Sequence, residues 1–125
     1  MIVDDSITVR KVTEKLLLHE NYLVEAARDG LEALEKLNSF EPDLMLMDIE
    51  MPRMDGFEVL EVVRQNPRWQ TLPIIMISSR TAEKHREHAE QLGATDFLGK
   101  PYQNQELLEL IQHHLDNSMV GVATV

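Results

Sequence analysis

Four short apolar segments of this chain each end at a polar or charged side chain. Asp4 and Asp5 follow Ile2-Val3, Asp48 follows Leu44 to Met47, Ser78 follows Ile74 to Ile77, and Lys100 comes soon after Phe97-Leu98. Short apolar runs that stop at a polar residue are typical of buried parallel strands, and ligands of open α/β sheets bind at the carboxyl ends of the strands. The pattern therefore predicts that three carboxylates, a hydroxyl and an ammonium group meet at one edge of a sheet.

Segments with helical periodicity alternate with these strands. We expect helices over residues 6–19, 30–37, 57–65, 82–92 and 105–115, and a further strand over residues 22–26. Strict alternation of strand and helix implies right-handed crossovers and a parallel sheet covered by helices on both faces. The expected fold is a doubly wound α/β domain with five strands and five helices.

Composition narrows the function classes. The chain has no cysteine, which excludes disulfides and thiolate metal sites, and its formal net charge of -10 disfavours binding to a nucleic-acid backbone. It has no long apolar run and no signal-peptide pattern, so we expect a cytoplasmic protein with no membrane contact. We expect one domain over residues 1–115 and a largely disordered tail over residues 116–125. The short first strand favours a domain cut from a longer protein.

Five motifs occur along the chain: Val3-Asp4-Asp5-Ser6, Ala27 to Leu34, Asp43 to Gly56, Pro73 to Ser78, and Gly93 to Pro101. In this order and at this spacing, they resemble the motifs of response regulator receiver domains, the phospho-aspartate switches of two-component signalling. The resemblance covers residues 1–115 and implies a flavodoxin-like sheet with strand order 2-1-3-4-5. The opening motif and the lack of an output domain resemble chemotaxis-type or hybrid-kinase receivers.

The resemblance implies that Asp48 accepts a phosphoryl group from a histidine kinase or its phosphotransfer domain. Clustered carboxylates repel one another and need a divalent cation to share, and hard oxygen ligands suit Mg²⁺. Asp5 and Asp48 would bind Mg²⁺ directly, Asp4 through water, and the backbone carbonyl of Glu50 would complete the set. Such a domain is a regulatory module that catalyses only its own phosphorylation and dephosphorylation.

The resemblance also assigns roles to residues around the acceptor. Lys100, before an expected cis bond to Pro101, and Ser78 would bind phosphoryl oxygens. Ser78 and Phe97 would then form the switch, with Phe97 replacing the tyrosine of many members, so that the face of helix 4, strand 5 and helix 5 changes for a downstream protein. Rigid packing of Phe97 in the core is the alternative.

Two positions that tune phosphoryl lifetime in this family are Glu50 and Arg80 here. Their opposite charges can pair over the phosphoryl group and obstruct attacking water, or both can remain solvated, because exposed ion pairs contribute only ~0 to 1 kcal/mol.

Two other functions share parts of this pattern. An aspartate-nucleophile phosphohydrolase also uses an aspartate at a strand end with Mg²⁺, but it needs an acid at the Glu50 position as proton donor and a cap domain. A flavodoxin-like cofactor binder shares the fold class, but no Gly-rich or hydroxyl-rich phosphate loop follows the first strand.

Overall fold

The computed structural model describes residues 1–115 and 122–125. Strands and helices alternate along the chain, with one 3-10 turn, η1, after the third helix. Their bounds are β1 Ile2–Val3, α1 Ile7–His19, β2 Ala26–Ala27, α2 Gly30–Leu37, β3 Met45–Asp48, α3 Gly56–Gln65, η1 Pro67–Trp69, β4 Ile74–Ser78, α4 Glu83–Gln91, β5 Asp96–Gly99 and α5 Asn104–Leu115.

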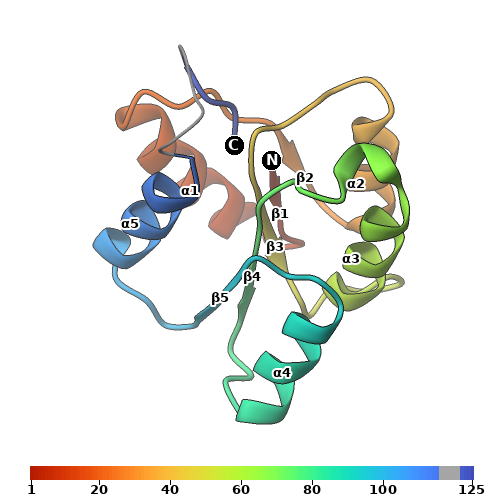
Figure 1. Cartoon of the computed structure of the whole chain (residues 1–125). Helices are drawn as coiled ribbons and strands as arrows, with labels where there is room; N and C mark the ends of the chain where they lie inside the picture. Colours follow the sequence, from red (N-terminus) through yellow and green to blue (C-terminus); the bar gives the residue numbers. More distant parts are fainter. Residues whose placement is uncertain (116–121) are drawn as a thin grey trace.

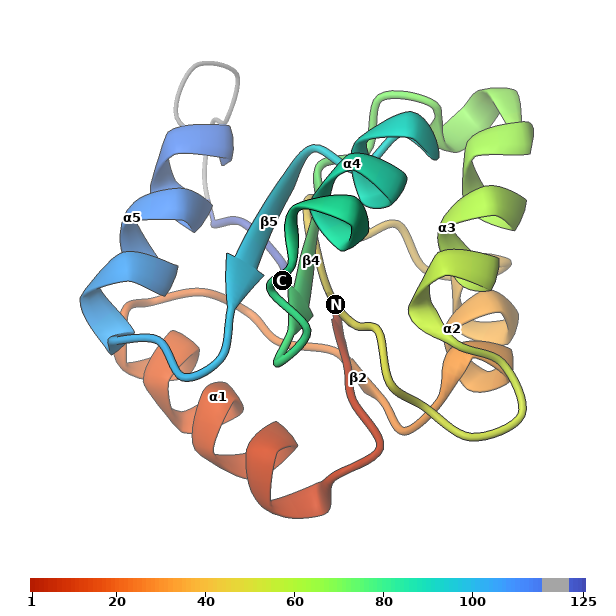
Figure 2. The ribbon, with the colours of Figure 1, turned by 90° about the horizontal axis from the view of Figure 1, so that it is seen from below.

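The strands form one parallel sheet in the order β2-β1-β3-β4-β5. Helices α1 and α5 cover one face, and α2, α3 and α4 cover the other (Figure 1, Figure 2). The predicted fold class and strand order are confirmed. None of the helices in the described residues is long and apolar enough to cross a membrane.

Alternation along the central strands divides the interior into two cores. Met45, Met47 and Met76 point into a cluster with α2 and α3, whereas Leu46 and Ile75 belong to a second cluster with α1 and α5. Because both faces of β3 and β4 are covered, every residue of these strands is buried, including the polar residues that end them, Asp48 and Ser78. The buried strands thus deliver polar groups to the rim of the sheet.

Local capping sets where the helices near this rim begin. Ser6, Asp29 and Asp55 cap α1, α2 and α3, and each side chain accepts a hydrogen bond from a backbone N–H of the first turn. Asp55 and Glu58 form a reciprocal capping box. The caps at Ser6 and Asp29 fix the chain direction just after β1 and β2.

The C-terminal segment lies in line with β1. The backbone N–H of Leu23 donates to the carbonyl of Ala123 (3.0 Å), that of Val125 donates to Leu23 (2.8 Å), and that of Asp43 donates to Thr124 (2.9 Å). Residues 123–125 therefore sit between the segments that lead into β2 and β3, where they extend the track of β1, and the two chain ends lie close together (Figure 1).

Two expectations are corrected here. The prediction of a disordered tail is wrong for residues 123–125, because Ala123 and Val125 are buried in the second core; residues 116–121 of that predicted tail lie outside the described residues. The strand predicted over residues 22–26 is reduced to Ala26–Ala27, with Leu23 held by an isolated bridge to Thr124. Both differences have one cause: the tail supplies hydrogen-bond partners that β1 is too short to provide.

Charging the buried end of this segment should unfold it. We expect Val125→Asp to lower the free energy of unfolding by about 2–4 kcal/mol, because the Val125 side chain is fully buried among apolar groups. Val122→Asp is the matched control, since Val122 is 60% exposed, and should change stability by less than about 0.5 kcal/mol. Equal effects in urea denaturation would contradict the placement of residues 123–125.

Candidate functional site

Three carboxylates meet at the carboxyl ends of β1 and β3. Asp4 and Asp5 follow β1, Asp48 ends β3, and these two strands are paired neighbours. One oxygen from each side chain lies within 4.8 Å of the others. Asp4 and Asp48 are buried and Asp5 is exposed. The predicted convergence of these residues is therefore present, with an opening to solvent on the side of Asp5.

The donor set fits a hard divalent cation. Three carboxylate groups so close together share their negative charge most favourably through a common cation, and Mg²⁺ takes oxygen ligands while keeping some of its water. Asp5, as the exposed member, leaves room for that water. Among the described residues, this is the one group of acidic or histidine side chains with the spacing of a metal site.

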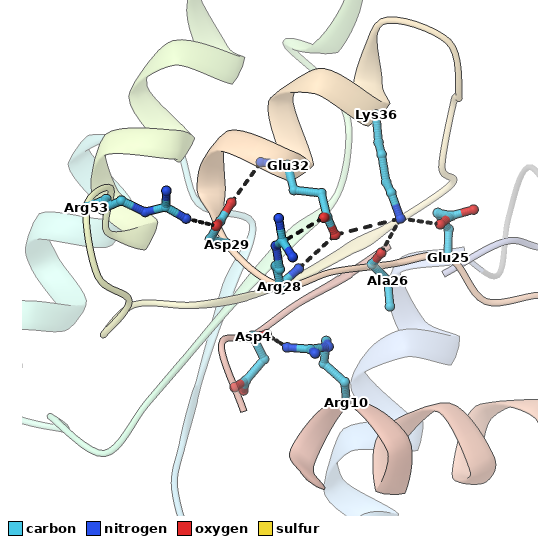
Figure 3. Close-up of polar contacts among 9 residues, drawn as sticks. All are labelled: Asp4, Arg10, Glu25, Ala26, Arg28, Asp29, Glu32, Lys36 and Arg53. Atoms are coloured by element: carbon cyan, nitrogen blue, oxygen red, sulfur yellow. Dashed lines mark hydrogen bonds and ion pairs between the residues drawn. The ribbon is translucent and has the colours of Figure 1, made fainter. Parts of the chain in front are cut away.

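The backbone around Asp4 is held by Ser6 and Arg10. The N–H of Ser6 donates to Oδ1 of Asp4 (2.8 Å), and the guanidinium of Arg10 donates to the Asp4 carbonyl oxygen (2.7 Å). Figure 3 shows the Asp4 carboxylate directed away from Arg10. Arg10 therefore fixes the turn after β1 while the Asp4 carboxylate stays directed away from this guanidinium.

Lys100 supplies a positive charge beside the carboxylates. Its Nζ lies 3.3 Å from Oδ1 of Asp48 and 3.7 Å from Oδ2 of Asp4. Its backbone N–H donates to the Ser78 carbonyl (2.8 Å), which extends the β4–β5 ladder, and the predicted cis bond to Pro101 is present. Burial lowers the pKa of Lys100, but attraction to Asp48 and Asp4 outweighs it, so the pKa lies above its ordinary value. Lys100 therefore remains an ammonium group.

Asp48 is a destabilised carboxylate. Burial raises its pKa from the ordinary 3.8 to about 6, and repulsion from Asp4 adds to the rise, while Lys100 acts in the opposite direction. A simple ion pair with Lys100 would lower the pKa of Asp48; the net rise shows that desolvation and like charge win at this position. Bringing a further positive charge to this edge would favour the ionised, nucleophilic form.

Ser78 lies at the end of β4 and is fully buried. Its hydroxyl donates to Oε1 of Glu50 (2.5 Å) and accepts a hydrogen bond from the backbone N–H of Arg80 (2.9 Å). The Arg80 Nε lies 3.7 Å from the same Glu50 oxygen, which agrees with the first of the two alternatives for this pair, an ion pair. Sequence reasoning did not anticipate the bond between Ser78 and Glu50.

Phe97 lies in β5 and is half-buried against the first core. The guanidinium carbon of Arg86, on α4, lies 4.7 Å from the centre of its ring, a cation–π distance. The contact of Phe97 with Arg86 could not be predicted from the sequence, because the two residues lie in different elements. Whether this ring moves during switching stays a prediction.

Two further residues position the loop after β3, and sequence analysis missed both. A Cβ atom at Gly56 would lie 2.4 Å from the Asp48 carbonyl oxygen, so only glycine allows α3 to start this close to Asp48. Arg53 forms an ion pair at 2.5 Å with Asp29, the cap of α2 (Figure 3). The hydrogen bond from the Glu32 N–H, followed by the charge of Arg53, lowers the pKa of Asp29. This pair anchors the loop that carries Glu50.

Comparison with known proteins agrees with this geometry. Residues 1–112 match the family model of the response regulator receiver domain. The chain is 34% identical to protein PilG of Pseudomonas aeruginosa over 115 residues, which is 92% of this chain and 85% of PilG. Several other curated relatives are longer, and the chain covers only 46% of their length.

Solved structures give the same result. Chemotaxis protein CheY4 of Vibrio cholerae superposes with a TM-score of 0.87 at 36% identity, covering 91% of this chain and 95% of CheY4. The receiver domain of a sensor histidine kinase from Pseudomonas aeruginosa superposes with a TM-score of 0.83 at 28% identity, covering 91% and 93% of the two chains. That structure has a magnesium ion in its active site cleft.

The raised pKa of Asp48 predicts a pH-dependent cost in stability. Because the folded-state pKa of about 6 exceeds the ordinary 3.8, the folded state binds more protons between these values, and its stability falls as the pH rises through this window. In EDTA at pH 7, Asp48→Asn should therefore increase the free energy of unfolding by about 1–3 kcal/mol. The gain should vanish near pH 4 and shrink when Mg²⁺ is added.

Urea denaturation at several pH values measures this effect. Asp5→Asn is the control, since the exposed Asp5 carboxylate keeps its hydration and its replacement should yield a smaller gain. If Asp48→Asn were no more stable than the native chain at pH 7 without metal, ionisation of Asp48 would not lower the stability of the folded domain, and the prediction would be wrong.

Proposed function

The chain belongs to the response regulator receiver family, and from this premise we propose that it is a phospho-accepting switch of a two-component system. Receiver domains are regulatory modules that work with histidine kinases and downstream effectors. In this proposal Asp48 accepts the phosphoryl group from a histidine kinase or its phosphotransfer domain. The observation that carries it is the position of Asp48, a destabilised carboxylate in contact with Lys100 and within 4.8 Å of Asp4 and Asp5.

The proposed reaction is an in-line displacement at phosphorus. A carboxylate oxygen of Asp48 forms a bond to phosphorus while the bond from phosphorus to the donor's imidazole nitrogen breaks, and the imidazole leaves with its electron pair. Water later attacks the acyl phosphate, which releases inorganic phosphate and restores Asp48. The chain is thereby both substrate and catalyst, and the products released over one cycle are the dephosphorylated donor and inorganic phosphate.

Asp4, Asp5 and Asp48, with the Glu50 backbone carbonyl, would hold Mg²⁺. Bound there, Mg²⁺ would neutralise the carboxylates and the charge on the transferring phosphoryl group. The ammonium group of Lys100 contacts the Asp48 carboxylate. After transfer it would pair with an oxygen of the phosphoryl group as a point charge. Ser78, at the end of the neighbouring strand β4, would donate its hydroxyl to another oxygen.

A downstream protein would bind the face formed by α4, β5 and α5. β5 is an edge strand of the sheet, and it carries Phe97, whose ring centre lies 4.7 Å from the guanidinium carbon of Arg86 on α4. A change at Ser78 would free space for Phe97 to move inward, which would alter what this face presents to a downstream protein. Glu50 and Arg80, at 3.7 Å, would shield the phosphoryl group from water.

Phosphohydrolase chemistry is less well supported by the same residues. It needs a carboxylic acid at position 50 that protonates a leaving group. The Glu50 Oε1 instead accepts a hydrogen bond from the Ser78 hydroxyl and lies 3.7 Å from the Arg80 Nε. A carboxylate oxygen that accepts these contacts is not free to carry a proton to a leaving group.

Incubation with acetyl phosphate and Mg²⁺ tests the proposal. We expect intact-mass spectrometry to show one phosphoryl adduct in the native chain and none in Asp48→Asn or in EDTA. An adduct that persists in Asp48→Asn would mean that another residue is the acceptor. Steady turnover of p-nitrophenyl phosphate by the native chain, at a rate lost in Glu50→Gln, would instead favour the phosphohydrolase.

A further inference from the structure

The hydroxyl of Ser78 has a second use in this structure besides the proposed contact with a phosphoryl group. It donates a hydrogen bond to Oε1 of Glu50 (2.5 Å) and accepts one from the backbone N–H of Arg80 (2.9 Å). The side chain is fully buried, so water does not compete for it. Its donor and one acceptor position are therefore both occupied within the protein.

A hydroxyl group carries one proton and can donate it to one strong acceptor at a time. If Ser78 donates to a phosphoryl oxygen on Asp48, as the proposed function requires, it cannot also donate to Glu50. The two hydrogen bonds are mutually exclusive, and each goes to a negatively charged acceptor of comparable strength.

Glu50 is held in place from two sides. It lies in the loop between β3 and α3, which is anchored by buried Met51 and by the ion pair of Arg53 with Asp29. The Arg80 guanidinium, from the segment that follows β4, lies 3.7 Å from the same carboxylate oxygen. Glu50 thus bridges the ends of β3 and β4 next to the acceptor.

We propose that Glu50 is a positioning residue that holds the Ser78 hydroxyl in the unphosphorylated domain and competes with the phosphoryl group for its proton. This inference rests on the proposed function and adds a regulatory step to it. On phosphorylation, the Ser78 hydroxyl stops donating its hydrogen bond to Glu50 and donates it to a phosphoryl oxygen instead. The Glu50 carboxylate is then left to the nearby Arg80 guanidinium, so loading of Asp48 and rearrangement of both loops are one event.

Binding of beryllium trifluoride with Mg²⁺, a stable stand-in for the phosphoryl group on a carboxylate, tests the competition. Calorimetry would compare the native chain with Glu50→Ala, Glu50→Gln, Ser78→Ala and the double variant Glu50→Ala/Ser78→Ala. Removing Glu50 should tighten binding by about tenfold in the presence of Ser78, because the hydrogen bond to a charged acceptor no longer has to be broken. With Ser78 replaced by alanine, the same change should tighten binding less than about twofold.

Charge alone would act differently. Glu50→Ala also removes a negative charge near an anionic ligand, and that effect is the same with or without the Ser78 hydroxyl. Glu50→Gln keeps an oxygen that accepts the Ser78 proton, so its gain should fall below that of Glu50→Ala. Equal gains from Glu50→Ala in both Ser78 backgrounds would overturn the inference while leaving the proposed function intact. A native chain that binds no beryllium trifluoride would overturn the proposed function and this inference together.

Discussion

Repulsion among the carboxylates at the ends of β1 and β3 is the constraint around which this site is organised. Asp48 has two acidic neighbours from the turn after β1, and its pKa of about 6 records what it costs to ionise a buried carboxylate beside Asp4. Lys100 offsets only part of that cost, since the pKa of Asp48 stays raised despite the contact at 3.3 Å. The folded domain therefore favours any event that brings positive charge to this edge, as the proposed binding of Mg²⁺ would.

The fold holds these charged side chains close together by restricting the backbone around them. Parallel strands covered on both faces leave their carboxyl ends as the place where polar side chains can meet. Gly56 lets α3 begin against the backbone of Asp48, and the ion pair of Arg53 with Asp29 holds the loop in between. Glu50, in that loop, then connects the end of β3 to Ser78 at the end of β4. The hydrogen bond between Ser78 and Glu50 thus links the ends of β3 and β4 at this rim.

Local patterns in the sequence were sufficient for the fold and for the core of the site. Apolar runs ending at Asp48 and Ser78 identified the strands, and strand ends in a parallel sheet had to converge. Contacts between distant segments were not predictable, because nothing local encodes them. Residues 123–125 pair with the segment around Leu23, ahead of the start of β1, so only Ala26–Ala27 pair with β1 as the second strand. Similarly, the bond from Ser78 to Glu50 depends on how two loops meet, and sequence spacing does not determine that.

Chemical trapping of the acyl phosphate tests the central claim most directly, namely that cation-assisted reactivity is confined to Asp48. Borohydride reduces an aspartyl phosphate to homoserine, and peptide mass mapping then locates the modified position among Asp4, Asp5 and Asp48. After treatment with acetyl phosphate and Mg²⁺, the expected result is homoserine at position 48 alone, and none when EDTA replaces the metal. Homoserine at position 4 or 5, or equal modification of position 48 without a divalent cation, would contradict it.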